Sequence, residues 1–171
     1  TSIGAKAFAG CAKFNDALVL SNTLASIGAN AFNGSGFTGS LTIPNTVTSL
    51  GDGAFANCVA FDGNLTIGNG ISAIKANMFA NSINFAKTLD LGTGVTTIEA
   101  GTFKGFKFTG TLTIPSQLTN IQNEVFMNCT GLTTLTMNEG ISSIGTNAFS
   151  GCSSLTGALT IPNSVGTIGD Y

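Results

Sequence analysis

A block of apolar and polar positions recurs along this chain every 23 or 24 residues. An aliphatic residue opens each block, and we number the copies from these openings: Ile3, Ile27, Leu50, Ile74, Ile98, Ile121, Ile144 and Ile168. Five residues after each of the first seven openings stands a phenylalanine, at Phe8, Phe32, Phe55, Phe79, Phe103, Phe126 and Phe149. Seven full copies and the start of an eighth predict a solenoid, in which stacked copies bury one continuous core.

Each copy later carries an alternating pair of large apolar residues, such as Leu41 and Ile43, with one residue between them. A period of two predicts a β-strand whose large residues point inward and whose middle residue faces water. Proline follows the pair directly in three copies, at Pro44, Pro115 and Pro162, and predicts the end of the strand. Residues 28–32 represent the other side of the coil, where an Ala-rich stretch without Pro predicts a short helical or 3₁₀ turn.

The outward strand position is mostly threonine and forms a candidate binding face. It reads Val19, Thr42, Thr66, Asp90, Thr113, Thr136 and Thr160. The position before the strand reads Ala17, Ser40, Asn64, Thr88, Thr111, Thr134 and Ala158. Three interpretations stay open: threonine favours exposed strand positions and keeps the face soluble, the two files form a binding surface, or the threonine ladder orders water and binds ice. Asp90 and Val19 interrupt the regularity that ice binding needs.

Charge is scarce in this chain, and this narrows the possible partners. Charged residues make up 8% of the 171 residues, against the usual ~25%, and the net charge is −2. This balance gives no electrostatic footprint for nucleic acid or an anionic membrane. The apolar runs are far shorter than the ~20 residues that span a bilayer, so we expect no membrane insertion.

The residue types that carry catalysis and metal binding are missing or scattered. The chain has no histidine, and its eight acidic residues are scattered across repeat columns, with no two in one column of neighbouring copies. An enzyme, a metal site and a cofactor are therefore not expected. The four cysteines, Cys11, Cys58, Cys129 and Cys152, share one column. Cys11 and Cys58 lie two copies apart, beyond the ~7 Å Cα limit for a disulfide, and buried free thiols that fill small spaces are the preferred interpretation.

The phrases "SIGTNAFSGCSSLTGALTIPNSV" (143–165) and "SIGANAFNGSGFTGSLTIPNTV" (26–47) resemble the BspA-like leucine-rich repeat family, and the similarity covers the whole chain. Residues 132–137, L-x-x-L-x-M, are one example of the general leucine-rich core. The resemblance implies a right-handed coil with a parallel strand ladder on its concave face. It also implies a bacterial or protist protein, at the cell surface or secreted, with roles in adhesion and protein binding.

Together these observations predict one leucine-rich-repeat domain over residues 1–171, an α/β repeat solenoid. Since neither end shows a polar cap, we expect the chain to be a window of a longer array. The expected function is a non-enzymatic adhesion or interaction module for a protein or glycan, with host extracellular matrix as one candidate. A structural spacer for another domain is the alternative. Three N-x-S/T sequons, at Asn33, Asn64 and Asn128, would be glycosylation sites in a secreted eukaryotic protein.

Overall fold

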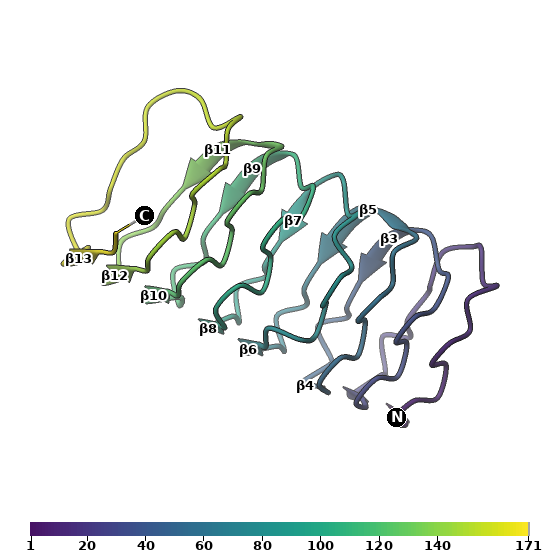
Figure 1. Ribbon diagram of the computed structural model, residues 1–171. Coiled ribbons are helices and arrows are strands. Elements are labelled where there is room, and N and C mark those ends of the chain that lie inside the picture. Colours follow the sequence, from purple (N-terminus) through teal and green to yellow (C-terminus); the bar gives the residue numbers. More distant parts are fainter. Residues whose placement is uncertain (171) are drawn as a thin grey trace.

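The structure is a computed structural model that describes residues 1–170, and it is a parallel β-solenoid of about seven turns (Figure 1). The solenoid expected from the repeat is therefore confirmed. The chain advances from one end of the coil to the other, so that the two termini lie at opposite ends. Each copy contacts its neighbours, as the one-dimensional character of repeat proteins requires.

One side of the coil carries the strands predicted from the alternating pairs, which we call the main ladder. Its strands are β3 (Gly39–Thr42), β5 (Phe61–Thr66), β7 (Leu89–Asp90), β9 (Gly110–Thr113) and β11 (Leu132–Thr136). They come from copies two to six and pair in parallel in two groups, β3-β5-β7 and β9-β11. The inward residues are buried as the alternation predicts, with Leu41 paired to Leu65 and both 0% exposed.

A second parallel ladder, which we call the minor ladder, lies at the openings of the copies. Its strands have two residues each: β1 (Ser2–Ile3), β2 (Ser26–Ile27), β4 (Ser49–Leu50), β6 (Ala73–Ile74), β8 (Thr97–Ile98), β10 (Asn120–Ile121), β12 (Ser143–Ile144) and β13 (Thr167–Ile168). The repeat marks the aliphatic residues of this column, but these strands were not predicted from the sequence. Two residues are too few for a period-two pattern to be visible.

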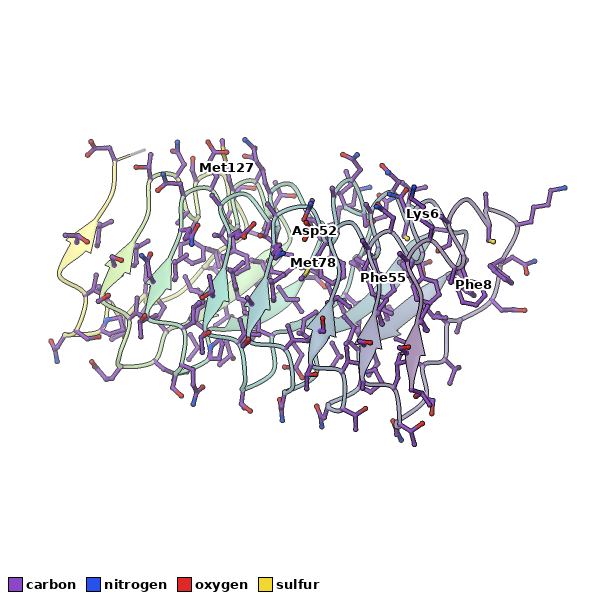
Figure 2. All side chains as sticks on the ribbon, turned by 90° about the horizontal axis from the view of Figure 1, so that it is seen from below. Lys6, Phe8, Asp52, Phe55, Met78 and Met127 are labelled. Carbon is purple, nitrogen blue, oxygen red and sulfur yellow. The ribbon has the colours of Figure 1, made fainter. Side chains whose placement is uncertain are left out.

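The phenylalanines that follow these openings form one continuous stack through the interior. Neighbouring rings from Phe8 to Phe149 lie 5.2 to 6.3 Å apart between centroids, and all six pairs are stacked. Figure 2 labels Phe55 within the coil and Phe8 near its N-terminal end, where Phe8 is 38% exposed. Aromatic pairs at this separation add to the free energy of burial, so the stack links every copy to the next.

The expected helical or 3₁₀ turns are wrong: residues 1–170 contain no helix of either kind. The segment after each minor strand, which we call the arc, is a run of tight turns. In copy two, Ala31 N–H donates to the Gly28 carbonyl within the turn, whereas Phe32 N–H donates to the Ala54 carbonyl of the next copy. Asn30 (φ 55°) and Gly34 (φ 68°) are left-handed. A left-handed residue at every fourth position prevents a helix, because a helix needs every residue right-handed.

Candidate functional site

The outer face of the main ladder brings together most of the predicted binding residues. Thr42 pairs with Thr66, and Thr66 pairs with Asp90, so these three side chains stand in one file. Thr113 and Thr136 form a second aligned pair of the same column. Thr42, Asp90, Thr113 and Thr136 are exposed and Thr66 is half-buried. The ladder spacing of ~4.8 Å sets the distance between successive side chains, so the surface is flat, regular and rich in hydroxyl groups.

The neighbouring file, from the position before each strand, is partly used to hold the copies together. Asn64 N–H donates to Ser40 Oγ at 3.0 Å. Thr88 donates to Asn64 Oδ1 twice, from its backbone N–H at 3.1 Å and from its Oγ1 at 3.0 Å. Thr111 and Thr134 pair in register and are both exposed. The polar groups of Ser40 and Asn64 are therefore less free to bind a partner than the threonines of the first file.

Two members of the first file lie outside the main ladder. Thr160 is exposed but belongs to no strand, and its inward neighbours Leu159 and Ile161 are 55% and 40% exposed. Val19, at the same column in copy one, is 88% exposed and also outside any strand. The ordered part of the predicted face thus comes from copies two to six.

The cysteine side chains lie on the inner side of the arcs and not on the candidate binding face. All four cysteines are free; Cys58, Cys129 and Cys152 are buried and Cys11 is half-buried. The three buried thiols do more than fill space, because each donates to the carbonyl of the phenylalanine one copy earlier, such as Cys129 Sγ to Phe103 at 3.1 Å. This explains why serine replaces cysteine in the column: Ser82 Oγ donates to the Phe55 carbonyl at 2.6 Å.

Burial of these thiols suppresses their reactivity. It raises the pKa of Cys129 to about 12, with a smaller contribution from Cys152, and it also raises the pKa of Cys58 and Cys152. Thiols react as thiolates, so these cysteines are inert near neutral pH. Copy five has Phe106 in the same column, which is 2% exposed and packs its ring 5.1 Å from that of Phe108.

Side-chain amides form a second set of links between the arcs, which was not predicted from the sequence. Asn57 Nδ2 donates to Asn33 Oδ1 at 3.2 Å, and Asn81 Nδ2 donates to Asn57 Oδ1 at 2.9 Å. Asn33 Nδ2 in turn donates to Asn30 Oδ1 at 2.9 Å. The signal in the sequence was the recurrence of Asn or Gly three and seven residues after most openings, a pattern that favours left-handed backbone.

Charged groups are few and do not converge. Lys75 pairs with Asp52 at 2.9 Å and Lys104 pairs with Glu124 at 2.7 Å, all four side chains being partly exposed. Within residues 1–170 no three His, Cys, Asp or Glu side chains come together as a metal site would require. No helix able to cross a bilayer was found in the same range.

Comparison with known proteins agrees with this architecture. A family model described as "BspA type Leucine rich repeat region (6 copies)" matches residues 1–108 and 62–171. The chain is similar to the leucine-rich repeat protein of T. pallidum, with 15% identity, a TM-score of 0.52 and coverage of 91% of this chain and 71% of that one. This supports the fold. A search among curated proteins found no match.

Two further solved structures are similar over nearly the whole chain. One is a leucine-rich repeat protein from Bacteroides ovatus, at 19% identity and a TM-score of 0.46, covering 98% of this chain and 66% of that one. The other is a leucine rich cell surface protein from Faecalibacterium prausnitzii, at 19% identity and a TM-score of 0.43, covering 99% and 57%. The chain therefore spans less than two thirds of the length of these two proteins.

Proposed function

This chain belongs to the BspA-type leucine-rich repeat family, and on this premise we propose that it is a non-enzymatic interaction module of a cell-surface or secreted protein. In this proposal residues 1–171 act as one domain, and the outer face of the main ladder meets a protein or glycan partner. Proteins of this family are generally interaction or surface proteins, which supports the proposal at the level of the class.

The observation that carries the proposal is the file of exposed hydroxyl groups on a rigid ladder. Strand pairing aligns Thr42 with Thr66 and Thr113 with Thr136. The residues on either side of the first three are buried, and those beside Thr136 are half-buried. A partner that meets this face pays little ordering entropy, because the ladder is already fixed. The face lacks aromatic and Arg anchors, so a single contact is weak, and strength comes from many copies acting together.

A structural spacer is the second candidate, and the unbroken phenylalanine stack supports it. A column of rings that links every copy makes the coil stiff along its length. In that case the threonines keep a strand surface soluble, and binding resides in another part of the protein.

A capture experiment separates the two candidates. The immobilised chain is incubated at physiological salt with host extracellular-matrix proteins and, separately, with a surface extract of the source organism. The test variant carries lysine at Thr42, Thr66, Thr113 and Thr136. Four long cations on a flat face block a close partner by size and charge, so we expect the variant to lose the captured protein or glycan.

The matched control carries the same four lysines elsewhere on the surface. Its positions are exposed threonines away from the main ladder, at Thr97, Thr119, Thr130 and Thr167. Both variants have the same net charge, so a loss seen only in the first variant supports the binding face. Equal capture by both variants contradicts it, and the absence of any captured partner favours the spacer.

A further inference from the structure

The main ladder is interrupted between copies four and five, at Asp90, the charged residue of the threonine file. Where neighbouring strands of the main ladder pair, a backbone bond follows the apolar pair: Ile67 N–H donates to the Asp90 carbonyl at 2.8 Å, and Ile114 N–H donates to the Thr136 carbonyl at 2.9 Å. In the part of the chain that the structure describes, the equivalent bond from Leu91 to Thr113 is missing. β7 is accordingly only two residues long and is not paired with β9.

Asp90 accounts for this interruption. Gly92 N–H donates to Asp90 Oδ1 at 2.9 Å, and Gly92 is left-handed with φ of 64°. An Asp side chain that accepts a bond from the amide two residues later turns the chain and competes with strand pairing. Threonine, which stands at this position in the flanking ladder strands, makes no such bond there.

A cavity of about 270 Å³ lies at the interruption, and its polar lining is rich in hydrogen-bond acceptors. The polar side chains around it include Asp90, Thr93, Thr113, Ser116 and Asn138. Asn138 turns its Nδ2 toward the Ile114 carbonyl, to which it donates, so its Oδ1 remains available as an acceptor. Asp90 has one carboxylate oxygen beyond the one that Gly92 occupies, and no cation of the described residues pairs with it.

This combination selects for a particular ligand. Pockets for drug-sized molecules measure ~300–1,000 Å³, so this cavity accepts a single side chain or a single ring. An ammonium group offers three donors and no acceptor, which suits a carboxylate surrounded by hydroxyl and amide oxygens. Leu91 and Pro115 also line the cavity and offer apolar surface to an aliphatic stem. No aromatic side chain lines it, so a sugar ring has no stacking platform there.

We propose that the interruption between β7 and β9 is a subsite for the ammonium group of a lysine side chain on a protein partner. The proposal rests on the proposed function of the main-ladder face and deepens it, because it names the chemical group that the face binds at Asp90. The Asp90 carboxylate binds the ammonium group, and the oxygens of Thr113 and Asn138 accept its remaining hydrogens.

Amide NMR shifts of the isotope-labelled chain test this subsite directly. The probe is Nα-acetyl-lysine methylamide, compared with its Nε-acetylated, uncharged form and with methyl glucoside. We expect saturable shifts at Gly92, Thr93 and Thr113 with the first probe alone. Asp90→Asn keeps the Oδ1 acceptor for the turn but removes the charge, and should weaken binding about fivefold or more. Asp62→Asn, on β5 away from the cavity, is the matched control and should bind the probe normally.

The results of the NMR titration test the subsite independently of the capture experiment. No saturable shift, equal shifts with the uncharged form, or unchanged binding by Asp90→Asn overturns it, and methyl glucoside shifting the same residues assigns the cavity to a sugar instead. If Asp90→Asn does not fold, Thr113→Lys on the exposed face supplies an internal competitor that should lower probe affinity. Partner capture without probe binding refutes the subsite alone, whereas probe binding without any captured partner refutes only the proposed function.

Discussion

The phenylalanine stack gives the sharpest test of how the copies are held together, through replacement of Phe55 by alanine. Phe55 is 0% exposed and lies between Phe32, at 5.2 Å, and Phe79, at 5.8 Å between ring centroids. The substitution removes a whole ring from a closed interior and breaks the stack in two. Neighbouring copies cannot close the gap without shifting the ladder hydrogen bonds on both sides.

The expected loss is large relative to the stability of an ordinary domain. A buried Phe→Ala change costs about 3–5 kcal/mol, and the two lost ring pairs place Phe55 toward the upper end of this range. Typical free energies of unfolding are about 5–15 kcal/mol. Phe8→Ala is the matched control, since Phe8 belongs to the same column but is 38% exposed and has one stacked neighbour. It opens no closed cavity, so we expect a loss of about 1–2 kcal/mol.

Urea unfolding followed by far-UV circular dichroism measures both losses, because the chain has no Trp to report by fluorescence. Repeat arrays do not always unfold in one step, so amide hydrogen exchange is needed as well. Exchange in the Phe55→Ala protein should accelerate most in copies two to four. Equal losses in the two variants, or less than about 2 kcal/mol for Phe55→Ala, would refute the role of the stack in coupling the copies.

Three further predictions address other contacts. Gly51→Ala places a Cβ against the backbone nitrogen of Ala29 and should lower the urea midpoint clearly, whereas Gly4→Ala, with no atom within 4 Å, should not. Equal midpoints for the two variants would contradict the close approach of the copies. Burial raises the pKa of Cys129 to about 12 from 9.0, so the thiol stays protonated to higher pH in the folded state than in the unfolded state. The stability difference between the natural chain and Cys129→Ser should therefore be complete below pH 9 and fall as the pH rises toward 12. A difference that stays constant from pH 8 to 10.5 would contradict this. Lys75→Met removes an exposed ion pair and should leave the melting temperature unchanged, so a clear drop would show that the pair matters.

The main ladder and the interior could be predicted because each copy repeats the same physical constraint. Leu41 and Ile43 are buried and alternate with an exposed Thr42. Only one register of the strand places both large residues in the core, because a shift by one residue would turn them to the solvent. The outward position of the threonine file followed from the same alternation. Its interruption did not, because Asp90 looked like a variant of the threonine file; only the bond from Gly92 shows that it ends the pairing.

The arcs were predicted wrongly for a different reason. Alanine-rich composition favours a helix, but Asn30 and Gly34 hold left-handed backbone that a helix excludes. The spacing of these residues is visible in the sequence, and their tolerance of positive φ is the physical clue. The minor ladder could not be predicted from the sequence, because its two-residue strands are defined by their pairing between copies and not by any local pattern.

The direction of the bonds between copies has a consequence for how the molecule bears load. Ladder bonds such as that from Ile43 to Thr66, and arc bonds such as that from Phe32 to Ala54, join each copy to the next and so run along the axis of the coil. A pull on the two ends loads these joints in series, and the weakest joint opens first. Each opened copy of 23 or 24 residues releases roughly 80 Å of extended chain. A tether of this design lengthens step by step under tension and dissipates the applied work before the connection as a whole is lost.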